Sequence, residues 1–156
     1  MDLKVTEATE QAIHYIGTHL REIDRKEATL VEGKHPLNQL RESWNVSDIC
    51  KVVRERFTGL PIAIVGRGTI ETPDLKLGVP WMVSTDDLKE HSRSFLRACP
   101  HWVNFLQGDC DLLMNWCLPE NITSIIWLKK MGFEFAKEPA PYGAFGVPFI
   151  RFWRYL

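Results

Sequence analysis

The sequence predicts an α/β domain in which helices flank a mixed β-sheet of about six or seven strands. Several short segments, bounded by Gly and Pro, carry apolar residues at alternate positions, which is typical of β-strands. Other segments carry apolar residues at helical spacing, and about four helices are expected from them. The clearest unit lies between residues 112 and 135, where a strand-like run, a short loop, an amphipathic helix and a second strand follow one another.

The chain has the size and composition of one globular domain. It contains 156 residues, of which 45% are apolar and 25% charged, so a single domain over residues 1–156 is expected. The net charge of −1 provides no global attraction for nucleic acid. No apolar run approaches the ~20 residues of a membrane span, and the start lacks the pattern of a signal peptide. We expect a cytoplasmic protein, monomeric or homodimeric, that binds neither nucleic acid nor membranes.

The four cysteines do not predict a metal site. They are Cys50, Cys99, Cys110 and Cys117, and no two of them form a C-x-x-C pair. Together with His101 they match no known spacing of a structural zinc site. We therefore expect buried or incidental thiols and no bound metal.

The elements are predicted as follows. Strands are expected at 3–6, 50–57, 60–65, 79–84, 112–118, 133–135 and 147–155. Helices are expected at 9–20, with Thr9 as the cap, and at 36–44, with Pro36 in the first turn. Two further helices are expected, one that begins after Thr85 or Asp86 and one from Asn121 to Gly132. A hairpin turn is expected at 58–59, and residues 66–68 should end the strand before them. Residues 71–78 are expected to be a polar linker and residues 140–146 a mobile loop. Pro100 should kink the helix after Asp86 or divide it in two.

Three charged residues in the first third of the chain have two interpretations. Arg21, Asp24 and Glu27 lie three residues apart and share one helix face. As an exposed charge ladder they would stabilise the helix by a few tenths of a kcal/mol per pair. Alternatively, Asp24 or Glu27 lies at a substrate site and serves as the general base for an amine, with His35 as a further candidate. We name Glu27 and Asp24 as the predicted catalytic residues.

The segment from 121 to 133 resembles a known family. It reads N-I-T-S-I-I-W-L-K-K-M-G-F, with Asn at the start of the helix and Gly-Phe after its end. This pattern resembles the second half of the GNAT fold, that of the acyl-CoA-dependent N-acetyltransferases. More closely, W-L-K-K-M-G-F followed by G-V-P-F-I-R-F resembles a group of small GNAT-like proteins of short-tailed phages, as does L-R-x-x-D-x-x-E from residue 20. Some members of that group are described as acetyltransferases and others as internal virion proteins.

The resemblance implies that acetyl-CoA enters between the strands at 79–84 and 112–118. Strands that diverge leave backbone groups with which the pantetheine arm of the cofactor can pair. The positive end of the helix that follows would face the pyrophosphate. The residues then expected to bind the cofactor are Trp81, Met82, Val83, Ser84, Thr85, Asn121, Ser124 and Trp127. Trp127 has a second interpretation, as a core residue that anchors its helix.

The chain departs from the GNAT pattern at two positions. GNAT proteins carry Q/R-x-x-G-x-G/A before the first of these helices, whereas residues 84–89 read S-T-D-D-L-K and contain no glycine. The carboxylates of Asp86 and Asp87 would repel a pyrophosphate, unless a nearby cation such as Lys89 compensates. The position at which many members place a proton-donating Tyr is Leu128, which cannot transfer a proton.

These observations lead to two hypotheses for the function. The first is an acyl-CoA N-acetyltransferase, in which an amine of a host protein or of a small molecule attacks the thioester directly. The second is a non-catalytic protein that keeps the fold and either binds a host protein or serves as a virion component, so that its location could also be the virion interior. The two departures favour the second hypothesis, whereas Asn121 and the Gly132-Phe133 pair favour the first.

Overall fold

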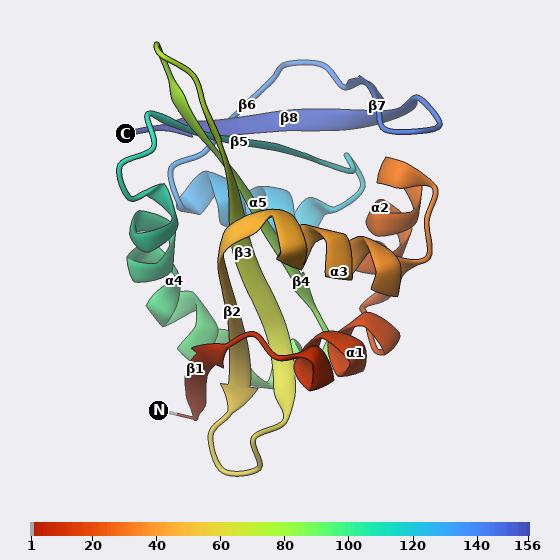
Figure 1. Ribbon diagram of the computed structural model, residues 1–156, viewed down its shortest axis with the longest axis vertical. Coiled ribbons are helices and arrows are strands. Elements are labelled where there is room, and N and C mark those ends of the chain that lie inside the picture. Colours follow the sequence, from red (N-terminus) through yellow and green to blue (C-terminus); the bar gives the residue numbers. More distant parts are fainter. Residues whose placement is uncertain (1) are drawn as a thin grey trace.

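The computed structural model describes residues 2–156 and contains one mixed β-sheet with helices against it (Figure 1). The elements follow in the order β1 (Leu3–Glu7), α1 (Glu10–Thr18), α2 (Glu22–Glu32), α3 (Pro36–Val46), β2 (Ser47–Glu55), β3 (Pro61–Glu71), β4 (Lys76–Ser84), the 3₁₀ helix η1 (Asp86–His91), α4 (Ser92–Gln107), β5 (Leu112–Cys117), α5 (Ile122–Lys130), β6 (Glu134–Phe135), β7 (Ala140–Tyr142) and β8 (Val147–Tyr155). The predicted fold class is confirmed. None of the described helices is long and apolar enough to cross a membrane.

The sheet consists of two antiparallel parts that meet at one parallel pair of strands. The strand order is β1-β2-β3-β4-β5-β8-β6, and β7 pairs with β8 outside this path. Only β4 and β5 run parallel to each other, and their ladder is two residue pairs long. Each other neighbouring pair in the path is antiparallel, so the one short parallel ladder, between β4 and β5, joins the two parts of the sheet.

Helices cover both faces of the sheet. Figure 1 shows α1 and α3 in front of the strands and α5 behind them. On the front face, Ile13 and Ile16 of α1 pack with Leu40 of α3 against β2 and β3. Behind the sheet, Leu128 of α5 and Val103 of α4 pack against β5 and β8. The apolar stripes that predicted these helices are the faces that they bury.

Several predicted helix boundaries are confirmed. The side chain of Thr9 accepts a hydrogen bond from Ala12 N and caps α1, and Pro36 is the first residue of α3. Asn121 caps α5 by accepting from Ser124 N. Gly132, with φ of 92°, follows α5 in the left-handed conformation that glycine adopts most readily.

Two predictions about the first hairpins are wrong. The strand at 60–65 does not end at 66–68, because β3 continues in register with β4 as far as Glu71. Gly66 is there for packing: a Cβ at this position would lie 2.4 Å from Trp81 Cζ2, so the absence of a side chain lets the indole lie on the strand. Residues 71–78 are accordingly no linker, since both ends belong to strands and only 72–75 form the turn.

The second half holds three further differences. The helix after β4 does not start there: Thr85 caps the short η1, and α4 starts only at Ser92. Of the two effects expected of Pro100, the division of the helix does not occur, because Pro100 lies inside α4. Residues 140–146 contain β7, and Ala144 N donates a 2.8 Å hydrogen bond to Val31 O, which ties this segment to the end of α2. All four cysteines are buried and unbonded to one another.

Candidate functional site

The candidate site lies where β4 and β5 diverge. The two strands pair at Leu77–Leu112 and at Gly78–Leu113, and beyond these positions no ladder joins them within the described chain. On its other side β4 pairs with β3 without a bulge, and Thr85 N donates to Ile62 O at the end of this ladder. Backbone groups alternate in direction along an antiparallel strand. The C=O group of Pro80 and the N–H and C=O groups of Met82 and Ser84 therefore point away from β3, toward the gap.

Most of this outer edge of β4 is already occupied. Pro80 has no N–H, and its C=O accepts a 2.7 Å hydrogen bond from Asn115 Nδ2, which joins the two strands just past the ladder. Ser84 N donates to Asp24 Oδ2, and Ser84 O accepts from Arg21 N, both at 3.0 Å. Within residues 2–156, the remaining backbone edge without a strand partner is that of Met82. A ligand that pairs with β4 in the gap must therefore pair there.

The backbone groups of two neighbouring residues do not serve as predicted. Trp81 and Val83 were expected to offer their backbone groups together with Met82, but the register of β3 and β4 turns those groups toward β3. Their side chains nevertheless line the gap on the face covered by α3. There Trp81 Nε1 donates a 2.8 Å hydrogen bond to Ser47 Oγ, which fixes the indole.

A cavity of about 490 Å³ passes through the gap. Side chains of α2 and α3 line it on one face of the sheet, and side chains of α4 and α5 on the other. Of the predicted site residues, Asp24, Glu27, Trp81, Met82, Val83, Asn121, Ser124 and Trp127 line this cavity. Ser84 and Thr85 do not, because they are 0% and 3% exposed and their N–H groups bond to Asp24 and Ile62.

Asp24 is neither an exposed charge nor a free base. It is 4% exposed, and its carboxylate receives two hydrogen bonds of 3.0 Å from the guanidinium of Arg21 in addition to that from Ser84 N. The interpretation of an exposed charge ladder is thus wrong for this residue. Bidentate pairs with arginine are strong and well oriented. Asp24 therefore holds α2 against the end of β4, and both of its oxygens are used.

Glu27 is placed to act as a base. Its Oε1 accepts hydrogen bonds of 3.0 Å from Leu118 N and from Asn121 Nδ2, whereas Oε2 accepts none from residues 2–156. Burial raises the pKa of the Glu27 carboxyl, and the two hydrogen bonds oppose this rise. A carboxyl with a raised pKa and one free oxygen in a cavity is suited to accept a proton from an ammonium group.

Asn121 connects Glu27 with α5. Its Oδ1 accepts from Ser124 N at 3.4 Å, and its Nδ2 donates to Glu27. The residue is 5% exposed, so its side chain is committed to contacts inside the protein. It therefore positions Glu27 and the first turn of α5.

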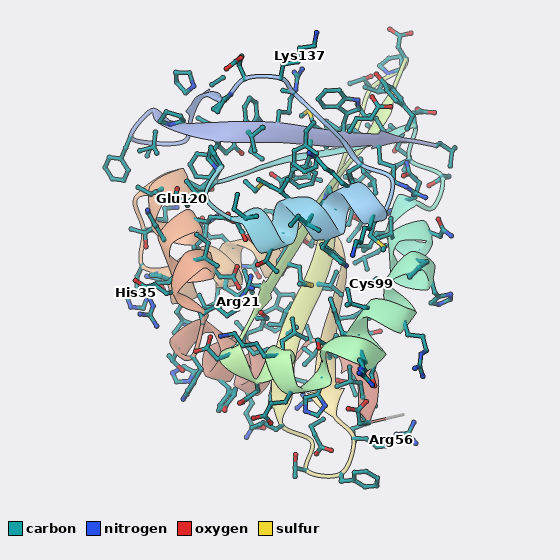
Figure 2. All side chains as sticks on the ribbon, turned by 180° about the vertical axis from the view of Figure 1, so that it is seen from behind. Arg21, His35, Arg56, Cys99, Glu120 and Lys137 are labelled. Atoms are coloured by element: carbon teal, nitrogen blue, oxygen red, sulfur yellow. The ribbon has the colours of Figure 1, made fainter. Side chains whose placement is uncertain are left out.

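The position of Trp127 is compatible with both of its expected roles, as a residue of the site and as an anchor of its helix. It lines the cavity, and its Nε1 donates a 3.2 Å hydrogen bond to Cys99 Sγ on α4, while its ring centroid lies 6.0 Å from that of Phe95. In Figure 2, Arg21 and Cys99 lie on the two sides of the region below α5. The indole thus bridges α5 and α4 along the side of the cavity that faces away from α3.

Tyr142, which is not among the predicted site residues, also lines the cavity. Its ring stacks on that of Trp116 with centroids 4.7 Å apart and an interplanar angle of 15°. Burial, followed by the charge of Glu32, raises the pKa of Tyr142, so its phenol is protonated at neutral pH. The only sequence signal was that Tyr142 is one of few late tyrosines, because its position on β7 depends on pairing with β8.

Comparison with solved structures identifies the fold. The spermidine N-acetyltransferase of Vibrio cholerae, in complex with CoA and spermine, superposes with a TM-score of 0.69 at 12% identity, over 99% of this chain and 95% of its own. A chain of the NatC complex bound to Gag peptide and CoA reaches 0.72 at 16% identity, over 100% and 99%. An acetyltransferase of the GNAT family from Streptococcus pneumoniae reaches 0.63 at 11% identity, over 99% of each chain.

The fold is the GNAT fold. No protein-family model and no curated protein sequence matches the chain. Two of the three GNAT neighbours were solved with CoA, which is consistent with the use of acyl-CoA by proteins of this architecture.

Proposed function

We propose that this GNAT-fold protein is an acetyl-CoA-dependent N-acetyltransferase. The observation that carries the proposal is the divergence of β4 from β5, which leaves the backbone edge of Met82 unpaired in a cavity beside the Glu27 carboxyl. This edge suits the amide groups of a pantetheine arm, which pair like an added strand. Side chains such as Leu40, Leu113 and Phe152 make the walls of the cavity largely apolar, and polar contacts are stronger in surroundings of low dielectric.

Different residues of the cavity have different roles in the proposed reaction. Acetyl-CoA supplies an acyl carbon that an amine can attack, so that a C–N bond forms and the C–S bond breaks. Met82 N–H is the donor available for the carbonyl oxygen. Glu27 accepts the proton of the ammonium group, directly or through water, and the protonated phenol of Tyr142 returns a proton to the sulfur. Leu128, at the position usual for the acid, cannot do this.

Removal of a single N–H group tests the proposal. Met82→Pro removes the N–H that faces the gap, and Pro80 shows that this edge tolerates proline. Met82→Leu is the matched control, because it keeps the N–H and an apolar side chain of similar size. We expect acetyl-CoA to bind to the control as to the wild type, and about 5- to 30-fold more weakly to Met82→Pro, as for one lost hydrogen bond. Calorimetry measures the affinities, and circular dichroism confirms folding.

If folded Met82→Pro and Met82→Leu bind acetyl-CoA with equal affinity, the edge of β4 is not part of the cofactor site. Failure of the wild type to bind millimolar acetyl-CoA would instead favour the second function, a non-catalytic protein that uses this fold to bind a partner. One observation speaks for that alternative: the segment after β4 forms η1 with Asp86 and Asp87 in its first turn, where a pyrophosphate would be expected.

The origin and the partners belong to the same proposal. The resemblance of residues 127–133 and 146–152 to proteins of short-tailed phages supports a phage origin, with the host cytoplasm as the place of action and a host protein or small amine as the acceptor. For the non-catalytic alternative, the corresponding place is the virion interior and the partners are other virion proteins.

A further inference from the structure

We propose that the acceptor is the free amino terminus of an extended polypeptide with apolar side chains, bound along α3. This inference rests on the proposed function and identifies its acceptor. Its basis is the part of the cavity on the α3 face of the sheet, which has the length, the polarity and the charge distribution that such a chain requires.

One face of α3 forms a continuous wall of the cavity. The lining residues Pro36, Gln39, Leu40, Ser43 and Val46 follow one another at spacings of three or one, so they lie on one side of the helix. With a rise of about 1.5 Å per residue, the wall is roughly 15 Å long. An extended chain rises by about 3.3 Å per residue, so four or five residues fit along it.

The opposite wall is formed by β4 and β5. It includes the indole of Trp81, which the Ser47 hydroxyl holds, and the ring of Trp116, which stacks on Tyr142. Flat aromatic surfaces and the apolar side chains of α3 suit uncharged side chains of a bound segment. A small, highly hydrophilic amine would leave most of this surface uncovered.

Negative charge is confined to the part of the cavity that α2 lines. Asp24 is paired with Arg21, and Glu32 lies 3.3 Å from Lys34, so both carboxylates have basic partners. Glu27 forms no salt bridge within the described chain. The wall of α3 carries no charged side chain among its lining residues. One free carboxyl followed by a neutral wall fits one ammonium group on a neutral chain, whereas a polyamine would require carboxylates at intervals.

A polar group on the wall lacks a partner. Gln39 Oε1 is buried and accepts no hydrogen bond from residues 2–156. A buried acceptor without a partner costs free energy, and once this amide turns toward the cavity, a backbone N–H of a bound chain would satisfy it. This requirement again favours a polypeptide over a simple alkylamine.

At the Val46 end of the wall, apolar side chains are exposed to solvent. Val46 is 76% exposed and Ile70, on β3 across the cavity, is 55% exposed, and both contribute to its lining. Apolar residues at the rim of a cavity are typical of a binding surface. We expect these two residues to contact the side chain of the third or fourth residue of the acceptor chain.

The test compares acceptors on the full chain with acetyl-CoA, with product masses as the readout. The first probe is a heptapeptide with a free amino terminus and leucine at positions two to four. The second has serine at these positions, the third is the leucine peptide with a blocked amino terminus and one lysine at its end, and the fourth is spermidine. We expect the first to be acetylated at its α-amine, with kcat/KM at least about tenfold above the other three.

Two variants locate the chain on α3. Val46→Lys places a charge where we expect the apolar side chain and should lower kcat/KM for the leucine peptide by about tenfold relative to spermidine. Phe57→Lys is the matched control, because Phe57 is 86% exposed in the distant β2–β3 turn, and it should have no effect. Binding of acetyl-CoA, measured by calorimetry, shows that either variant retains its fold and cofactor site.

The outcomes separate this inference from the proposed function. If acetyl-CoA does not bind, both are wrong. If acetyl-CoA binds but spermidine or the lysine side chain is the better acceptor, or if Val46→Lys acts no differently from Phe57→Lys, the function stands and the acceptor has been assigned wrongly.

Discussion

At the scale of single residues, the proposed chemistry depends on Glu27. It reaches from α2 to the start of α5 and lies beside the gap between β4 and β5. Burial raises its pKa, so the folded state binds the Glu27 proton more tightly than the unfolded state does. The stability that protonated Glu27 contributes is present below the ordinary pKa of about 4.3 and is lost as the pH rises through the raised pKa.

Replacing this carboxyl by an amide gives a prediction about rate and one about stability. Glu27→Gln keeps an oxygen for Leu118 N and Asn121 Nδ2 but cannot accept a proton. We expect kcat/KM at neutral pH to fall by about 100-fold or more. We also expect the unfolding free energy of the variant to decline less than that of the wild type as the pH rises from about 4.3. Steady-state kinetics and urea unfolding at several pH values measure the two effects.

Glu22→Gln is the control for Glu27, because Glu22 lies exposed on the same helix. It should change neither the rate nor the pH dependence of stability. If Glu27→Gln behaves like Glu22→Gln in both experiments, Glu27 is not the base and its burial carries no cost.

At the scale of elements, α5 depends on its first residues. Asn121 caps the helix and also donates to Glu27, so one side chain links α5 to α2. Asn121→Ala removes both interactions and should lower the unfolding free energy by about 1–2 kcal/mol. It should also raise the pKa of Glu27 further, because the hydrogen bond from Asn121 opposes the effect of burial.

Asn121→Ser separates the two interactions of this side chain. Serine is a good N-cap but is too short to replace the contact with Glu27, so we expect a loss of stability smaller than that of Asn121→Ala. Urea unfolding of both variants makes the comparison. An Asn121→Ala protein as stable as the wild type would show that neither interaction stabilises the fold.

The elements differ in how far their sequences determine them. Local signals were sufficient for α5, because a capping Asn at one end and Gly132 at the other fix both boundaries. They were insufficient for β3, since a glycine at position 66 predicts the end of a strand, whereas in the structure it makes room for Trp81 of the neighbouring strand. Contacts between distant segments decide such positions, and one sequence does not show them.

At the scale of the whole molecule, the cavity results from a sheet whose two antiparallel parts meet at β4 and β5. The family resemblance placed the cofactor between these strands, and six of the eight predicted cofactor residues line the cavity. The sequence could not show that both carboxylate oxygens of Asp24 accept hydrogen bonds from Arg21 and Ser84. Nor could it show that Tyr142, on β7, lines the cavity. Both depend on pairings between segments that lie far apart along the chain.

The proposed function requires that the gap between β4 and β5 binds acyl-CoA. A crystal structure of the protein with CoA would show whether it does. We predict that an amide N–H of the pantetheine arm donates a hydrogen bond to the C=O of Met82, and that the sulfur lies in the cavity near Met82 N–H, Glu27 and Tyr142. CoA bound elsewhere on the protein, away from the outer edge of Met82, would contradict the claim.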